Sequence, residues 1–230
     1  IYLYEPFIGS IEKKYVNDCL NSNWISSKGK YVKLFENRFK KYIKIKHAIS
    51  ICNGTAALHV ALLSLGIGPK DEVITPTFTY IATANSINYV GAKVRFVDSK
   101  ISSWQIDENE IIKNINSKTK AVLIPHLYGQ SCEMSKIQKI CKINKLFLVE
   151  DCAEAFGTFY GKNHVGTFGD VATFSFFGSK TITTGEGGMV VTNNLNIAKK
   201  ANELKMVGND KDKYYWHNVI GYNYRMTNIC

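Results

Sequence analysis

The chain has 230 residues, 45% of them hydrophobic and 21% charged, which are the proportions of an ordinary globular protein. Its six cysteines and five histidines are dispersed without metal-type spacing, so we expect reduced thiols in a cytoplasmic protein and no metal site. No apolar stretch has the length of a membrane span and no signal peptide is visible, so no membrane partner is expected.

The formal net charge is +10, and eight basic residues lie between Lys28 and Lys46 with a single acid, Glu36. Such a run can form a nucleic-acid patch. Apolar residues in the same stretch recur at the spacing of a helix face: Val32, Phe35, Phe39 and Ile43. We favour a solvated helix and expect no nucleic-acid partner, because no nucleic-acid module pattern accompanies the charge.

Short apolar runs alternate with helical stretches along the chain. The expected strands are 47–52, 71–76, 92–98, 121–129, 146–151, 171–177 and 187–193. The expected helices lie within about 10–45 and at 54–68, 79–91, 134–144 and 195–207. This alternation predicts one α/β domain with a mostly parallel sheet. Ligands of such folds bind at the carboxyl ends of the strands and at the facing helix N-termini.

The stretch CNGTAAL, residues 52–58, lies at an expected strand-to-helix junction. Gly54 permits close approach of a ligand to the backbone. Free amides of Thr55 and Ala56, with the Thr55 hydroxyl and the helix dipole, would suit a phosphate. The alternative is an ordinary helix cap by Asn53 or Thr55, which this motif alone favours.

Acidic residues end the apolar run LFLVEDCAEAFG, residues 146–157. Glu150 and Asp151 should face opposite sides of the strand, because side chains alternate along it. One of them can then meet a ligand while the other packs or caps, and Glu154 follows three residues after Asp151. The pattern alone leaves open whether Asp151 contacts a ligand or caps a helix.

Lys180 ends the aromatic run DVATFSFFGSK, which also contains Ser175. Lysine is rarely buried unless it is paired or reactive, and an amine in such a place can attack a carbonyl. The alternative is a solvent-facing lysine at a strand end. In TFTYIATAN, residues 77–85, Tyr80 could stack on a flat ring or pack in the core. Together, a phosphate cradle, an acid, an aromatic platform and an amine are what pyridoxal 5′-phosphate (PLP) requires.

The chain resembles the PLP-dependent sugar-nucleotide aminotransferases of the DegT/StrS family, and especially the 4-aminotransferases related to GDP-perosamine synthase. The resemblance extends to Cys230 and is carried by NGTAAL, PTFTYIATAN, VEDCAEAFGTFYGKNHVGTFGD, TFSFFGSKTITTGEGGMV and IGYNYRMTNIC. It implies the three-layer α/β/α large domain of a fold-type I PLP-dependent transferase over residues 1–230, with an N-terminal helical segment at about 10–45. The family continues into a smaller C-terminal domain, which is absent from this chain.

The resemblance also implies a role for each matching residue. Lys180 matches the lysine that binds PLP covalently, and Asp151 matches the partner of the pyridine nitrogen. Glu154 matches the position beside the ring hydroxyl, and Tyr80 matches the stacking aromatic. The other matches form the phosphate site: Gly54, Thr55, Ala56 and Ser175 in one subunit, and Asn223 from a second subunit.

The implied reaction transfers an amino group from glutamate to C4 of a nucleotide-linked 4-keto-6-deoxyhexose. The product would be of the GDP-perosamine or dTDP-4-amino-4,6-dideoxyglucose type, and the enzyme would be a homodimer with shared active sites. One alternative is a PLP-dependent sugar dehydratase, but in those relatives histidine replaces the lysine, so Lys180 argues against it. Another alternative is a regulatory or binding protein on the same fold.

Overall fold

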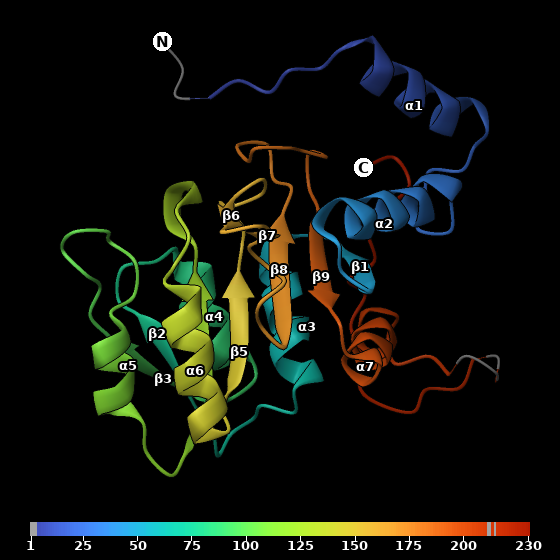
Figure 1. The fold of residues 1–230 in the computed structure, drawn as a ribbon. Coiled ribbons are helices and arrows are strands. Elements are labelled where there is room, and N and C mark those ends of the chain that lie inside the picture. The colour runs from blue at the N-terminus through green and yellow to red at the C-terminus, as the bar shows by residue number, and fades with distance from the viewer. Residues whose placement is uncertain (1–3, 211–212, 214) are drawn as a thin grey trace.

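A central sheet lies between two layers of helices in the computed structural model, which describes residues 4–210, 213 and 215–230 (Figure 1). Its strands are β1 (His47–Ile51), β2 (Glu72–Pro76), β3 (Lys93–Val97), β4 (Thr119–Pro125), β5 (Phe147–Asp151), β8 (Val171–Ser175) and β9 (Gly188–Thr192). Their order across the sheet is β1-β9-β8-β5-β4-β2-β3. A separate hairpin pairs β6 (Phe159–Tyr160) with β7 (Asn163–His164).

Most neighbouring strands in the sheet are parallel. The pairs β2–β3, β2–β4, β4–β5 and β5–β8 are parallel, whereas β9 runs antiparallel to both β8 and β1. Because β1 and β8 are both antiparallel to β9, β1 runs in the same direction as the parallel strands, and the carboxyl ends of six strands meet at one edge of the sheet. The expected α/β domain with a mostly parallel sheet is confirmed.

Helices cover both faces of the sheet. On one face lie α3 (Gly54–Ser64), α4 (Ile81–Tyr89) and α7 (Leu195–Lys205); on the other lie α2 (Lys30–Ile43), α5 (Glu108–Asn114) and α6 (Met134–Asn144). Side chains of β5 alternate between these layers, so that Val149 packs with α3 and Leu148 packs with α6. Helix α3 is buried on all sides along residues 56–62, which fixes its N-terminus against the sheet.

The basic segment forms α2, as its apolar spacing predicted. Phe39 and Ile43 are buried, and the Phe39 ring lies 5.0 Å from that of Phe174 in β8. Helix α1 (Ser10–Asn21) precedes it and extends away from the sheet (Figure 1). Within the described residues, no helix combines the length and apolar character needed to cross a membrane.

Two expected strands are shorter than the sequence indicated. The strand expected over 121–129 ends at Pro125, because the chain turns through a short 3-10 helix at Leu127–Gly129. The strand expected over 171–177 ends at Ser175. Lys180 therefore lies on the loop that follows β8 and does not itself end a strand.

Candidate active site

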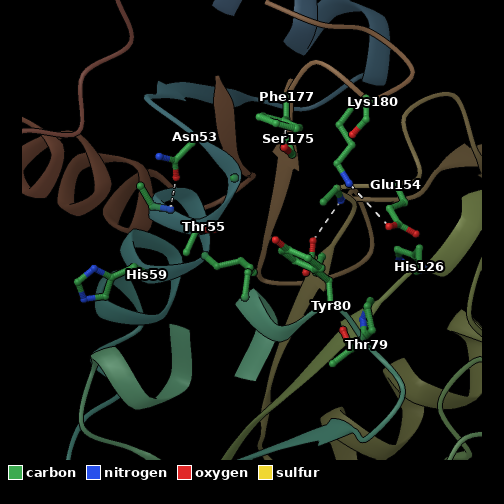
Figure 2. Close-up of a pocket in the computed structure, with 18 of the residues that line it drawn as sticks. Asn53, Thr55, His59, Thr79, Tyr80, His126, Glu154, Ser175, Phe177 and Lys180 are labelled. Atoms are coloured by element: carbon green, nitrogen blue, oxygen red, sulfur yellow. Dashed lines mark hydrogen bonds and ion pairs between the residues drawn. The ribbon is translucent and has the colours of Figure 1, made fainter. Parts of the chain in front are cut away.

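A cavity of about 670 Å³ opens where the carboxyl ends of β2, β4, β5 and β8 meet the N-terminus of α3. Its lining includes eight of the residues expected from the sequence: Gly54, Thr55, Ala56, Tyr80, Asp151, Glu154, Ser175 and Lys180. Figure 2 shows Lys180 and Glu154 on one side of this space, Tyr80 below them and Thr55 at the start of α3. The topology thus brings together residues that lie 126 positions apart in the sequence, from Gly54 to Lys180.

Lys180 is held by an acidic neighbour. Its Nζ lies 3.7 Å from Oε1 of Glu154, and both side chains are about a quarter exposed, at 23% and 30%. The second oxygen, Oε2, accepts the backbone N–H of Tyr128 at 2.9 Å. Glu154 therefore orients the lysine amine and also joins the loop after β4 to the site (Figure 2).

Asp151 ends β5 with its side chain in the cavity and only 7% of the residue exposed. Its Oδ2 accepts the hydroxyl of Thr83 at 3.0 Å, and its Oδ1 accepts the N–H of Ala153 at 3.1 Å. Burial raises the pKa of Asp151 above its ordinary value, although these hydrogen bonds and the nearby charge of Lys180 oppose the rise. A cation placed against this carboxylate would stabilise its ionised form.

Glu150 faces the opposite side of β5, as the alternation of strand side chains predicted, and is fully buried. Oε1 accepts the N–H groups of Phe168 and Gly169 at 2.8 and 2.7 Å, and Oε2 accepts the N–H of Gly166 at 2.7 Å. Oε2 also lies 3.1 Å from Nε2 of buried His126. Glu150 therefore secures the 166–169 segment and the histidine behind the cavity.

His126 follows β4 and lines the cavity, a role that the sequence reasoning did not assign. Its Nδ1 accepts the backbone N–H of Cys132 at 3.1 Å, which leaves Nε2 as the nitrogen that donates to Glu150. His126, Glu150 and Cys152 each have an atom that could coordinate a metal ion, and these three atoms lie within 4.8 Å of one another. The sequence did not predict this group. Since the histidine and the glutamate already have hydrogen-bond partners, we assign this group to structural hydrogen bonding.

The N-terminus of α3 forms the opposite end of the cavity. Asn53 caps this helix by accepting the N–H of Ala56 at 2.8 Å, so the expected cap is present and the Ala56 amide is paired rather than free. A Cβ at Gly54 would lie 2.8 Å from Cβ of Ser175. Glycine therefore lets the helix start approach the end of β8, which brings the hydroxyls of Thr55 and Ser175 to the same cavity. Two hydroxyls at a helix N-terminus suit an anion.

The chain matches the DegT/DnrJ/EryC1/StrS aminotransferase family over residues 6–230. It belongs to this family. It is 54% identical over its whole length to GDP-perosamine synthase of Escherichia coli O157:H7 and 50% identical to that of Vibrio cholerae, and it covers 63% of each. The chain thus spans about three-fifths of the length of these relatives. The expected family is confirmed.

Solved structures of similar proteins share the fold. The aminotransferase from Psychrobacter cryohalolentis aligns with a TM-score of 0.94 at 34% identity, over 100% of this chain and 61% of that one. The PLP form of the putative sugar aminotransferase Spr1654 from Streptococcus pneumoniae aligns with a TM-score of 0.93 at 29% identity, over 100% of this chain and 64% of that one. The expected fold-type I architecture is confirmed.

Asn223 is the one residue of the expected site that lies outside the lining of the cavity. Its side chain is exposed, and its Oδ1 accepts Nε and Nη2 of Arg225 at 3.0 and 2.8 Å. The next residue, Tyr224, does line the cavity. The family role of Asn223 towards a second subunit stays a prediction.

His59 is a second cavity residue that the sequence reasoning missed. It is 5% exposed, and burial lowers its pKa. Its Nδ1 lies 3.3 Å from the hydroxyl of Tyr224, and its ring lies 4.8 Å from that of Tyr222. Its Nε2 is buried without a hydrogen-bond partner among the described residues. The only feature of the sequence that could have indicated His59 as a cavity residue is its position as a histidine within the apolar helix α3.

Proposed function

We propose that the protein containing this chain is a PLP-dependent aminotransferase acting on C4 of a nucleotide-linked 4-keto-6-deoxyhexose, with glutamate as amino donor. The observation that carries the proposal is the convergence of Lys180, buried Asp151 and the α3 N-terminus on one cavity. Family membership and the identity with two GDP-perosamine synthases support the reaction and the substrate class. The assignment of residues 1–230 to the large domain, and a cytoplasmic location, belong to the same proposal.

The residues of the cavity fit PLP in their chemistry. Lys180 supplies a primary amine, and Asp151 supplies a buried carboxylate whose ionised form a cationic ring nitrogen would stabilise. Tyr80 offers a ring that is 70% exposed, and Thr55 and Ser175 offer hydroxyls beside a helix N-terminus. PLP, when bound, acts as an electron sink that stabilises a carbanion next to the transferred amine.

Residues of the chain itself would then transfer and hold the protons of the reaction. Nζ of Lys180 would remove the Cα proton of the amino donor and pass it to the cofactor, and in the second half of the reaction it would take a proton from the cofactor and deliver it to C4 of the sugar. Glu154 keeps this amine directed into the cavity through the 3.7 Å contact. Asp151 holds a proton on the ring nitrogen, because a buried carboxylate favours an adjacent positive charge. His126 and Glu150 support the wall behind Asp151.

We also propose a homodimer with shared active sites. Asn223 is exposed and next to the cavity residue Tyr224, which is a suitable place from which to reach a neighbouring subunit. Tyr222, Tyr224 and Arg225 in the same segment are partly exposed and belong to residue types enriched at interfaces. In a symmetric dimer, Asn223 of each subunit would extend to the active site of the other subunit.

The test uses the full-length protein. After addition of PLP and reduction with sodium borohydride, mass spectrometry should find the cofactor mass on the peptide containing Lys180. Lys180→Ala should abolish this adduct, whereas Lys113→Ala, which removes an exposed lysine of α5, should retain it. An adduct on another lysine would overturn the assignment.

The substrate is tested separately. Glutamate should convert the absorbance of bound PLP into that of the pyridoxamine form, after which GDP- or dTDP-4-keto-6-deoxyhexose should gain an amino group, measured by mass spectrometry. A completed glutamate half-reaction with no aminated sugar from either nucleotide would refute the substrate class. A bound cofactor without any half-reaction would favour a binding or regulatory protein.

A further inference from the structure

Three exposed aromatic side chains form a row beside the cavity: Phe78, Trp104 and Tyr128. They are 36%, 59% and 79% exposed, and the Phe78 ring centroid lies 5.0 Å from that of Trp104 and 6.5 Å from that of Tyr128. The three residues follow β2, β3 and β4, at the same edge of the sheet as the cavity. Phe78 directly precedes the cavity residues Thr79 and Tyr80.

A buried glutamine fixes the spacing of this aromatic row. Gln105 is 4% exposed; its Nε2 donates to the carbonyl of Leu127, and its Oε1 accepts the N–H of Leu127, both at 3.2 Å. Trp104 precedes this glutamine and Tyr128 follows this leucine. One side chain therefore ties together the two loops that carry the outer rings of the row.

The backbone at both ends of the row is in an unfavourable conformation. Trp104 has a φ of 62° and Tyr128 a φ of 53°, in the left-handed region that bulky residues rarely occupy. Because both rings are exposed, burial in the core does not compensate for this cost. Strained residues that the surrounding structure holds in place concentrate at ligand sites. The two strained residues therefore mark the row as a candidate ligand site.

The row begins near the reacting end of the cavity and leads away from it. The N–H of Tyr128 donates to Oε2 of Glu154, whose Oε1 lies 3.7 Å from Nζ of Lys180. From Tyr128 the row passes through Phe78 to Trp104. In a nucleotide-linked hexose, the diphosphate and the ribose separate the base from C4 of the sugar. When C4 lies at Lys180, the base must lie further out.

We propose that Phe78, Trp104 and Tyr128 form the subsite for the nucleotide part of the substrate, with the base stacked on Trp104. This inference rests on the proposed function and specifies how the same site holds its substrate. Aromatic side chains bind bases through stacking, which tolerates different bases because each has a π-face. The preset spacing of the rings lowers the ordering cost of binding. A free nucleoside diphosphate should therefore bind without the sugar.

The test titrates the full-length protein with GDP and with dTDP, following tryptophan fluorescence and the heat of binding. Trp104→Leu should raise the Kd by about 10- to 100-fold, the range expected for loss of one stacked base. Trp104→Phe should restore part of the affinity, because a smaller ring can still stack. Trp216→Leu is the matched control, since Trp216 is 57% exposed and does not line the cavity, and its Kd should equal that of the wild type.

An unchanged Kd in Trp104→Leu would overturn the subsite. If this variant also no longer self-associates in sedimentation, the row would be assigned to contact with a second copy of the chain. The glutamate half-reaction of the wild type needs no nucleotide, so its absence would refute the proposed function independently of the subsite.

Discussion

Glu150 and Asp151 are adjacent in β5, yet their carboxylates lie in opposite surroundings. Glu150 accepts three backbone N–H groups and contacts His126, whereas Asp151 accepts one hydroxyl and one N–H and borders the cavity. Burial raises the pKa of Asp151. The first carboxylate is thus satisfied by the fold itself, and in the proposed function a ligand that carries positive charge would complete the second.

The first prediction concerns stability without cofactor. The pKa of Asp151 in the folded state is raised above its ordinary value of 3.8. At a pH between the ordinary pKa and the raised pKa, the folded state therefore binds more protons than the unfolded state. Stability from this group therefore falls as the pH rises through that interval, and the ionised carboxylate is unfavourable at pH 7. Asp151→Asn should raise the free energy of unfolding of the apo protein by about 1 kcal/mol at neutral pH, the usual size of a stabilising replacement. Below the ordinary pKa the gain should vanish.

Thermal unfolding of the apo protein at neutral and acidic pH measures this effect. Asp107→Asn is the control, because Asp107 caps α5 by accepting the N–H of Asn109, and asparagine caps equally well. Added PLP should raise the Tm of Asp151→Asn less than that of the wild type, since the amide cannot balance a cationic ring nitrogen. A variant that is less stable than the wild type at pH 7 without PLP would contradict the prediction.

The second prediction concerns Glu150. In Glu150→Gln, an amide NH₂ group replaces one carboxylate oxygen and faces N–H donors that it cannot accept. His126 cannot turn to compensate, because its Nδ1 already accepts the N–H of Cys132. We expect a loss of about 3 kcal/mol in the free energy of unfolding, with faster hydrogen exchange at Gly166, Phe168 and Gly169.

Denaturant unfolding and amide hydrogen exchange test this loss. Glu110→Gln provides the comparison, since Glu110 makes a surface ion pair with Lys113 and should contribute less than about 1 kcal/mol. Equal stability of the two variants would show that Glu150 fills space and that its charge contributes nothing.

The sequence predicted most of the α/β order, because apolar periodicity is strong in the buried strands and in α3. It did not predict α5, a seven-residue helix, or the β6–β7 hairpin, whose strands have two residues each. Elements this short carry too few periodic positions to be recognised. The ends of β4 and β8 were misplaced because apolar residues continue past the last hydrogen-bonded pair.

The cavity residues were largely predictable, because ligands of parallel sheets bind at the carboxyl ends of strands. The pairing of His126 with Glu150 was not, because the two residues are 24 positions apart. They meet only through the register of β4 and β5, which places Ile124 opposite Glu150. The left-handed conformations of Trp104 and Tyr128 carry no sequence signature, since glycine or asparagine is the usual residue there.

The third prediction concerns the contact between Gly54 and Ser175. Gly54→Ala should destabilise the fold by about 1–3 kcal/mol, because the new Cβ would lie 2.8 Å from Cβ of Ser175. Adding Ser175→Gly removes the opposing atoms, so the double variant should regain most of the loss. Gly68→Ala is the control, since the atom nearest to its Cβ would be 4.0 Å away. Thermal unfolding compares the four proteins, and a double variant no more stable than Gly54→Ala would show that the clash is not the cause.

The last prediction tests sharing of the site between subunits of the full-length protein. Lys180→Ala removes the amine of a subunit's own cavity, and Asn223→Asp places a negative charge where the proposed dimer would bring Asn223 to the partner's phosphate site. Each homodimer should be nearly inactive. In a mixed dimer with shared sites, one site carries both lesions and the other carries neither. After subunit exchange at equal concentrations, half of the dimers are mixed and each has one intact site, so activity should return to about a quarter of the wild-type value.

Coupled assay of sugar amination measures the recovery, and mass spectrometry of differently tagged subunits verifies the exchange. Complete exchange without recovery would mean that Asn223 acts within its own subunit, because the mixed dimer would then contain only singly damaged sites.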